Sequence, residues 1–259
     1  MKAWDPELYL QFEEERTRPA RDLLARITLK DPHYVSDLGC GPGNSTALLY
    51  DAYPQATITG VDSSEPMLQQ ARQRLTSCVF QLADVSTWHP KNPQNIIYAN
   101  AALQWVPDHK RLLPHLVQQL AQDGVLAFQM PDNLDQPSHA LMRKVAIEGA
   151  WKDKIGESAF RSKRLLATNT YYDLLAGQGC EVDIWRTTYY HVMPSATAIV
   201  DWVRSTGLRP FLSPLDESEQ KMFLQRYLAE LQQAYRRQEN GNVLLAFPRI
   251  FIVARKSKR

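Results

Sequence analysis

Cysteine is scarce in this chain of 259 residues, and its three cysteines, Cys40, Cys78 and Cys180, stand far apart. An odd number of isolated thiols argues against both a disulfide framework and a thiolate metal site. His109 and His115 are no better as metal ligands, because their spacing puts them on nearly opposite faces of a helix. We therefore expect reduced cysteines and no bound metal. Cys40 has no sequence partner for nucleophilic chemistry and is expected to be a small packed residue.

Long apolar runs and a large excess of charge of either sign are also missing. No run approaches the ~20 apolar residues that span a bilayer. The opening segment MKAWDPELYLQFEEERTRP lacks the basic start and apolar stretch of a secretion signal. We expect a cytoplasmic protein without membrane contact. The net charge is +2, and the basic run RKSKR at the end is interpreted as a solvated terminus, so no nucleic-acid partner is expected.

Glycine is scarce too, with 11 in the chain, yet three alternate at positions 39, 41 and 43 of the stretch VSDLGCGPGNST. The pattern predicts a strand over 34–38 and a helix that begins near Asn44 or Ser45, which are good N-cap types. Ligands of open α/β sheets bind at the carboxyl ends of strands, where bare glycine backbone permits close approach. We expect a ligand at this loop.

Extended and helical patterns alternate through the first half, which is typical of βαβ units and a parallel sheet. Later, two strand patterns follow one another without the usual return helix, which suggests an antiparallel edge. Pro248 fits an edge strand or bulge better than a sheet centre. The predicted strands are 34–38, 56–62, 78–84, 95–100, 124–130, 180–193 and 242–255. The predicted helices are 44–54, 63–75 and 109–121, with mostly helical stretches at 132–178 and 195–237.

Asp37, two residues before the first glycine, helps to define the ligand. A carboxylate would repel a pyrophosphate but could pair with an ammonium group. The dinucleotide fingerprint G-x-G-x-x-G also fails, because Asn44 stands where the third glycine would be. The chemistry therefore favours a ligand with an amino-acid portion.

Two further aspartates end the next predicted strands. Asp62 could accept hydrogen bonds from both hydroxyls of a ribose. Asp84 could accept a hydrogen bond from the exocyclic amine of adenine, while the backbone N–H of Val85 donates one to the ring. Each aspartate alone could equally cap a helix or lie in a solvated loop. Three acidic residues on successive strand ends, beside a glycine loop, favour a nucleoside site.

The segments VSDLGCGPGNS, GVDSS, LADV and IIYANAALQWVPD resemble, in order and spacing, the motifs of class I S-adenosylmethionine-dependent methyltransferases. The resemblance implies an α/β fold, Rossmann-like and doubly wound, with a seven-stranded mostly parallel sheet, an antiparallel last strand and helical cap insertions. It also implies S-adenosyl-L-methionine as cofactor and S-adenosyl-L-homocysteine as product. The cofactor-binding residues it implies are Asp37, Gly39, Gly41, Gly43, Asp62, Ser63, Met67, Asp84, Val85, Asn100, Ala101 and Arg16.

The same resemblance implies a division of labour among these residues. Asp37 and the glycines would hold the methionine end, and Asn100 with Ala101 would line the sulfonium. Asp62 would bind the ribose. Met67 would stack beneath the adenine, or else pack in the core as an ordinary helix residue.

Longer segments, from WDPELYLQFEEERTRPARDLL to NVLLAFPRIFIVAR, resemble a branch of this family that methylates a small polycarboxylate. A carboxylate is already a nucleophile at neutral pH, so no catalytic acid or base is expected. The protein has only to align the reactants in a pocket that excludes water. Arginine forks and tyrosine hydroxyls suit such an anion. The substrate-binding candidates are Tyr189, Tyr190, Arg209, Trp105, Gln129 and Arg186, with Arg249 as a further one. On a regular strand Tyr189 and Tyr190 face opposite ways, so both could meet one acceptor only at a bend.

We expect a single methyltransferase domain over 1–259, acting as a monomer or weak homodimer. Its expected parts are an N-terminal helical lid (1–30), a cofactor-binding half (31–131), helical insertions and cap around strand 180–193 (132–240), and a last strand with basic tail (241–259). Pro19 should break the first segment into two helices, with a hinge near Thr17.

Three other functions remain open at the level of sequence. Another methyl acceptor, such as a phenolic small molecule, is the nearest alternative. A dinucleotide-dependent oxidoreductase is opposed by Asp37 and Asn44. A non-catalytic nucleoside-binding module would carry the same motifs.

Overall fold

The computed structural model describes residues 13–160, 164–204 and 206–257, and the side chains of residues 13–16 and 158 lie outside that description. The described residues contain a seven-stranded sheet in the order β3-β2-β1-β4-β5-β7-β6. Its strands are β1 (Tyr34–Leu38), β2 (Thr57–Asp62), β3 (Val79–Leu82), β4 (Gln94–Asn100), β5 (Leu120–Pro131), β6 (Cys180–Met193) and β7 (Val243–Lys256).

The strand directions confirm the predicted fold class. β1 pairs in parallel with β2 and β4, β2 with β3, and β4 with β5. The last strand, β7, runs antiparallel to β5. β5 begins at Leu120, four residues before the predicted start, and β3 ends at Leu82, so that Asp84 lies in the following loop.

Of the two places predicted for Pro248, an edge strand or a bulge, the edge strand is wrong. β7 is flanked by β5 and β6, and β6 is the edge. The pairing of β7 with β5 starts only at Arg249, opposite Pro131. Pro248 precedes the paired stretch, and its carbonyl accepts a bond from the backbone N–H of Asp132 (2.9 Å). The missing N–H of proline therefore removes no bond from that ladder.

The helices agree with the predicted pattern except at their ends. They are α2 (Glu13–Ala25), α3 (Asn44–Ala52), α4 (Glu65–Arg74), α5 (His109–Gln118), α6 (Pro137–Glu148), α7 (Thr168–Ala176), α8 (Ala196–Arg204), α9 (Arg209–Leu212) and α10 (Glu217–Ala234), with 3-10 turns η1 (Leu103–Trp105) and η2 (Glu157–Phe160). Helix α2 continues through Pro19, so the predicted break there is wrong. Proline costs a helix one hydrogen bond, and the burial of Ala20 and Leu23 on the same helix offsets that loss.

The chain divides into two compact units. Among the described residues, we call Glu14–Pro131, Leu165–Thr187 and 249–257 the α/β unit, and those within Asp132–Arg164 and Thr188–Pro248 the helical unit. β6 and β7 contribute residues to both units. No described helix is both long enough and apolar enough to cross a bilayer.

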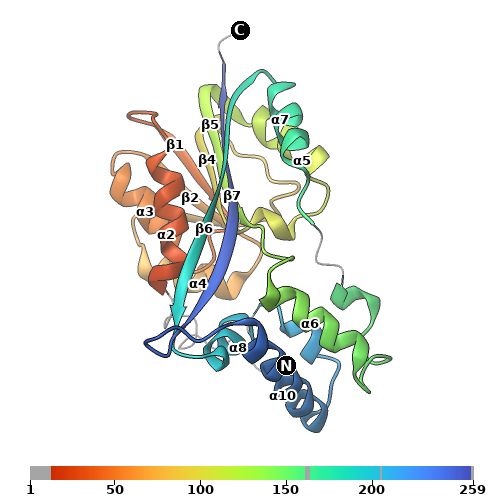
Figure 1. Cartoon of the computed structure of the whole chain (residues 1–259). Coiled ribbons are helices and arrows are strands. Elements are labelled where there is room, and N and C mark those ends of the chain that lie inside the picture. Colours follow the sequence, from red (N-terminus) through yellow and green to blue (C-terminus); the bar gives the residue numbers. More distant parts are fainter. Residues whose placement is uncertain (1–12, 161–163, 205, 258–259) are drawn as a thin grey trace. The chain divides into compact units, whose positions relative to one another are not determined.

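In the α/β unit, helices cover both faces of the sheet. α2 and α3 lie on one side and α5 and α7 on the other (Figure 1). Alternate residues of β4 serve the two faces: the hydroxyl of Tyr98 donates to the carbonyl of Ala20 on α2 (2.7 Å), whereas Ile97 and Ala99 belong to the apolar cluster that includes α5 and α7. The middle of the strand is therefore buried on both sides, which explains the apolar run IIYA at 96–99.

The helical unit has a core of its own. Trp151 packs against Phe223 of α10, with ring centroids 5.3 Å apart. Helices α6 and α10 are also joined by the buried hydroxyl of Tyr227, which donates to the carbonyl of Ser138 (2.6 Å). Asp216 and Glu219 form a capping box that satisfies backbone N–H groups at the start of α10.

Candidate functional site

The predicted cofactor residues meet at one edge of the α/β unit. Neighbouring parallel strands end there in register: Asp62 of β2 stands opposite Leu82 of β3, and Asn100 of β4 stands opposite Gln129 of β5. The glycine loop follows β1, which lies between β2 and β4. Four consecutive strand ends of the sheet thus carry the polar residues and the loop, as expected for a ligand site at a carboxyl edge.

The glycine loop is closed on one side and open on the other. A Cβ added to Gly39 would lie 2.3 Å from the Cβ of Ala102, so this position is filled by the neighbouring loop. A Cβ added to Gly41 would meet no atom of the described residues within 4 Å. Both glycines have positive φ, at 69° and 53°. The backbone at Gly41 is therefore accessible to a ligand, which is the property the sequence predicted.

Helix α3 begins at Asn44, as predicted, but without the expected side-chain cap. Its N-cap is Gly43, in the left-handed region, and no side chain caps it. Ser45 does not cap the helix because its hydroxyl donates instead to Asp37 Oδ2 (2.7 Å), as does the hydroxyl of Thr46 (2.7 Å). The first turn of the helix thus organises the aspartate of the preceding strand.

Asp37 is fully buried, and the structure shows hydrogen bonds from described residues to only one of its oxygens. Oδ1 has no hydrogen-bond partner among the described residues. Burial raises the pKa of the Asp37 carboxyl from its ordinary 3.8 to about 6, against the opposing effect of the bonds from Thr46 and Ser45. A buried acceptor without a donor is costly, and a ligand ammonium would satisfy it. The observed geometry fits the amino-acid end of S-adenosylmethionine.

Asp62 has a structural role that the sequence did not reveal. Its Oδ2 accepts the backbone N–H of Gly41 (2.9 Å) and its Oδ1 that of Ser64 (2.9 Å). The carboxylate therefore ties the glycine loop to the start of α4. Each oxygen has a second lone pair, so the predicted bond to a ribose hydroxyl stays compatible with this role.

Asp84 belongs to a local turn in the loop after β3. Its Oδ1 accepts from both the backbone N–H and the hydroxyl of Ser86, at 2.8 and 2.7 Å. These bonds from Ser86 lower the pKa of the exposed Asp84 carboxyl. Val85 is buried in the apolar cluster, Met67 is half-buried on α4, and Ser63 is exposed. Local turn chemistry is one of the two interpretations that the sequence left open for Asp84.

Cys40 is buried beside this site. Burial raises the pKa of its thiol further above the ordinary value, and the carboxylates of Asp37 and Asp62 act in the same direction. A thiol held in its protonated form is a poor nucleophile. Cys40 therefore serves as a packed side chain, as predicted.

The loop after β4 is held in a strained conformation. Ala101 has a φ of 51°, which is unusual for a residue with a Cβ. Its N–H donates to the carbonyl of Gln129 (3.0 Å), and its carbonyl accepts from the side chain of Gln104 (2.6 Å). Backbone strain of this kind gathers at functional sites, and the place of Ala101 beside the reacting group stays a prediction.

A buried polar chain, which sequence reasoning missed, leads away from this loop. Gln129 is fully buried, and its Nε2 donates to Asn100 Oδ1 at 2.5 Å. Its Oε1 accepts from the guanidinium of Arg249 (3.0 Å), which is itself 4% exposed. Only the antiparallel pairing of β7 with β5 brings Arg249 to Gln129, 120 residues earlier in the chain.

The predicted substrate-binding residues are divided between the two units. In the α/β unit, Trp105 is 71% exposed on η1, while the exposed Arg186 donates to the hydroxyl oxygen of Thr168 (2.7 Å). Gln129 is buried as described above. The side chain of Arg16 lies outside the described part of the chain.

In the helical unit, both tyrosines lie within β6, where buried and exposed residues alternate. Tyr189 is buried, with its ring parallel to that of His191 at 6.4 Å, whereas Tyr190 is 63% exposed on the opposite face. The structure therefore does not turn them toward one point. Arg209 is exposed at the start of α9.

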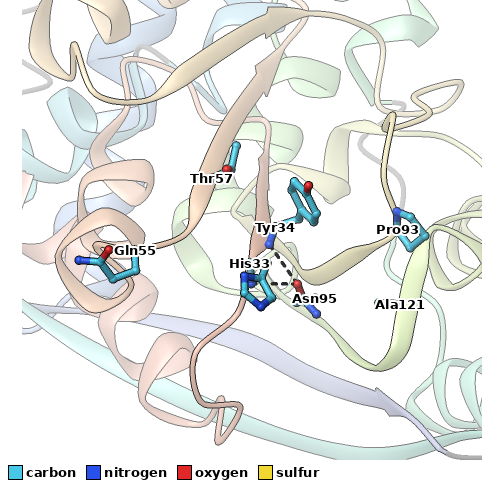
Figure 2. A pocket seen from close by; sticks show the side chains of 7 residues that line it. All are labelled: His33, Tyr34, Gln55, Thr57, Pro93, Asn95 and Ala121. Atoms are coloured by element: carbon cyan, nitrogen blue, oxygen red, sulfur yellow. Dashed lines mark hydrogen bonds between the residues drawn. The ribbon is translucent and has the colours of Figure 1, made fainter.

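A hollow of about 430 Å³ lies at the other end of the sheet (Figure 2). It is open, and the side chain of Asn95 accepts from the backbone N–H groups of His33 and Tyr34 there, both at 3.0 Å. Tyr34 and Thr57 begin β1 and β2, so the hollow is at the amino edge. Its lining residues are His33, Tyr34, Gln55, Thr57, Pro93, Asn95 and Ala121.

The two histidines considered as metal ligands have other partners. The ring nitrogens of His109 contact the hydroxyl of Tyr171 and the carbonyl of Leu103, both at 2.8 Å. His115 contacts the carbonyl of Trp88 (2.9 Å). Within the described ranges, no group of three His, Cys, Asp or Glu side chains is arranged to hold a metal ion.

Fold and site together define a methyltransferase. Residues 12–210 match the model of a family described as a methyltransferase domain, and the chain belongs to that family. It is 59% identical over 254 residues to trans-aconitate 2-methyltransferase of Yersinia pseudotuberculosis (serotype O:1b, strain IP 31758), covering 98% of each chain. It is 56% identical over 258 residues to the protein of the same name in Escherichia coli O157:H7 (strain EC4115 / EHEC), covering 100% of each chain.

Among solved structures, the chain resembles phosphoethanolamine N-methyltransferase 2 of Haemonchus contortus, crystallised in complex with S-adenosyl-L-methionine. The TM-score is 0.58 at 14% sequence identity, and the match covers 93% of this chain and 53% of that one. At this identity the likeness concerns the fold alone. The methyltransferase fold predicted from the motifs is confirmed.

Proposed function

We propose that this chain is an S-adenosylmethionine-dependent O-methyltransferase that converts one carboxylate of trans-aconitate to its monomethyl ester. The observation that carries the proposal is the 59% identity, over 98% of the chain, to a protein named for this activity. That similarity runs through both units, so it includes the helical unit as well as the strand ends that carry the cofactor motifs.

The α/β unit would hold the methyl donor. Asp37 Oδ1 would accept from the ligand ammonium, the open backbone at Gly41 would lie against the methionine portion, and Asp62 would bind the ribose. S-adenosylmethionine, when bound there, supplies a methyl group activated by a positively charged sulfur. Asp84 and Val85 would contact the adenine.

The chain's work on the acceptor is orientation rather than proton transfer. A carboxylate oxygen carries a lone pair at neutral pH, so no base has to create the nucleophile. The side chains have to hold a trianion, aim one oxygen and exclude water. Tyr190, Arg209, Trp105 and Arg186 are exposed donors suited to this task, whereas the buried Tyr189 would act by packing.

The N-terminal segment, residues 1–30, would act as a lid whose Arg16 reaches the bound ligands. Ala20 and Leu23 are buried in the α/β unit, so the second half of α2 would stay in place when the lid moves. Sedimentation analysis is expected to give a monomer or weak homodimer, and fractionated cells are expected to hold the protein in the cytoplasm.

Mass spectrometry after incubation with S-adenosylmethionine tests the proposal. Trans-aconitate is expected to gain one methyl group, and cis-aconitate, isocitrate and citrate to react far less. The product should be hydrolysed by alkali, as an ester is and an aryl ether is not. Absence of methyl transfer to all four acids would contradict the proposed function.

A further inference from the structure

Arg249 fixes the direction of the buried polar chain at the carboxyl edge of the sheet. A guanidinium has five N–H donors and no acceptor. The group next to it must therefore present an oxygen, and Gln129 does so with Oε1 at 3.0 Å. Because Gln129 is fully buried, no solvent is available to support the reverse orientation of its amide.

The orientation of Gln129 in turn fixes that of Asn100. With its oxygen toward Arg249, Gln129 has only its amide nitrogen left to face Asn100, and it donates to Asn100 Oδ1 at 2.5 Å. The Asn100 side chain is half-buried, and its Nδ2 has no acceptor among the described residues. The buried polar chain therefore ends in an N–H₂ group, which is a donor, at the carboxyl end of β4.

Gln129 also holds the backbone beside that donor. Its carbonyl accepts the N–H of Ala101 at 3.0 Å, and Asn100 stands opposite Gln129 in the register of β4 and β5. The side chain of Asn100 and the strained peptide after it are thus both attached to one residue. This double attachment leaves the Asn100 amide little freedom to turn over.

We propose that Gln129 is a positioning residue that transmits the donor-only character of Arg249 to Asn100, so that Asn100 donates to a carboxylate of the acceptor. The proposal rests on the proposed function, because a polycarboxylate is the ligand that an outward N–H₂ attracts and an outward amide oxygen repels. It gives Gln129 a role through Asn100 rather than in contact with the substrate, and it gives Asn100 a part in choosing an anionic acceptor.

Asn100→Asp tests the end of the chain. One carboxylate oxygen can still accept from Gln129, while the other replaces the outward donor with a negative charge. The KM for trans-aconitate should rise about 10- to 100-fold, as expected when a hydrogen bond to a charged group is lost. Because Asn100 is also predicted to lie beside the cofactor sulfur, the affinity for S-adenosylhomocysteine is measured by calorimetry as well, and the KM for trans-aconitate should rise by a clearly larger factor than the Kd for S-adenosylhomocysteine.

Gln129→Glu tests the relay itself. The variant keeps the shape of the side chain and its bond to Arg249, but a carboxylate cannot donate to Asn100 Oδ1, so the Asn100 amide turns over. A purely structural role for Gln129 predicts a KM equal to that of the wild type, because the ion pair preserves the packing. If Gln129 sets the orientation of the Asn100 amide, the KM for trans-aconitate should rise while the Tm stays unchanged.

Gln94→Glu is the matched control. Gln94 is a buried amide at the amino end of β4, the strand that ends with Asn100. It forms hydrogen bonds with Ser36 and Asn92. It lies roughly 20 Å along the strand from Asn100. The same chemical change there should leave the KM for trans-aconitate unaltered.

The outcomes separate the inference from the proposed function. If the wild type methylates trans-aconitate and both variants keep its KM, or lose affinity for S-adenosylhomocysteine in proportion, the inference is wrong and the function stands. If the wild type neither methylates nor binds a polycarboxylate, both are wrong. A Gln129→Glu protein that fails to fold leaves the decision to Asn100→Asp.

Discussion

The two units of this protein differ in how their functional residues are gathered. In the α/β unit, the residues predicted to bind the cofactor follow β1, β2, β3 and β4, and these strands end side by side in one sheet. In the helical unit, Tyr189 and Tyr190 lie on opposite faces of one strand, and Arg209 begins a separate short helix. A parallel sheet therefore assembles a site by its own regularity, whereas a helical unit assembles one only through its particular packing.

The same contrast holds for burial and charge. The α/β unit buries Asp37 and Arg249 almost completely and gives each a specific side-chain partner, Ser45 for Asp37 Oδ2 and Gln129 for Arg249. The helical unit carries most of its charged side chains at the surface, as in the ion pairs of Lys144 with Glu230 and Arg226 with Glu148. Substitutions at the cofactor edge should accordingly have larger effects than substitutions at the exposed acceptor candidates.

Asp37→Asn should have the largest effect. It removes the carboxylate for the ligand ammonium, and S-adenosylhomocysteine affinity at pH 7 should fall about 100-fold or more, as for a buried ion pair that loses one partner. Binding to the wild type should weaken as pH falls through about 6, where Asp37 becomes protonated. Calorimetry across this pH range is the measurement, and equal affinities for the two proteins at pH 7 would remove Asp37 from the site.

The same substitution should stabilise the ligand-free protein. A folded-state pKa of about 6, against 3.8, means that the folded wild type binds protons more tightly than the unfolded chain. The contribution of Asp37 to the free energy of unfolding of the wild type is therefore greatest at low pH, and it decreases as pH rises through 6. At pH 7 Asp37→Asn should raise the free energy of unfolding by about 3 kcal/mol, and the gain should vanish below about pH 4. Urea unfolding of the wild type and the variant at pH 4 and pH 7 is the measurement. A variant that is no more stable than the wild type at pH 7 would contradict the prediction.

Gly41→Ala should weaken cofactor binding by about 10-fold or more, because the added methyl group occupies the open backbone where a ligand would lie. The positive φ at Gly41 also costs roughly 1–2 kcal/mol of stability for an alanine. Gly179→Ala is the control: Gly179 has a φ of 77° and equally open space, but lies in the turn before β6. Equal losses of affinity in both variants would mean that backbone strain alone, and not the open space at Gly41, is responsible.

Asp62→Asn should have a smaller effect on the same affinity, about 10-fold. The amide nitrogen cannot accept the N–H of Gly41 or Ser64, so one of these two bonds is lost and the loop loosens. Asp173→Asn, at an exposed position on α7, serves as the control for the loss of one charge. Affinities for S-adenosylhomocysteine that match the wild type in both variants would contradict the role of Asp62.

Arg209→Ala should have the smallest effect, raising the KM for trans-aconitate about 5-fold and leaving that for S-adenosylmethionine unchanged. Arg209 is exposed, so its interaction with an anion is weakened by solvent. Arg204→Ala, at another exposed arginine of the helical unit, should change neither KM. Should the two variants behave alike, Arg209 has no special place in acceptor binding.

Particular elements explain which predictions succeeded. The strands 34–38 and 180–193 agree with β1 and β6 at both ends, because apolar residues and turn residues mark them locally. Helix α2 was predicted to break at Pro19 and does not, since burial of the helix outweighs a local preference. Ser45 was predicted as a helix cap and serves Asp37 instead.

The sequence by itself determined the fold class, the glycine loop and the row of acidic strand ends. These features depend on short-range patterns and on the geometry of parallel sheets, which is the same in every such sheet. Only the tertiary structure decided that Asp62 anchors the loop at Gly41 and that Arg249 controls Gln129 and Asn100. Those contacts join residues far apart in the chain, and their chemistry depends on which atoms are buried together, which no local pattern encodes.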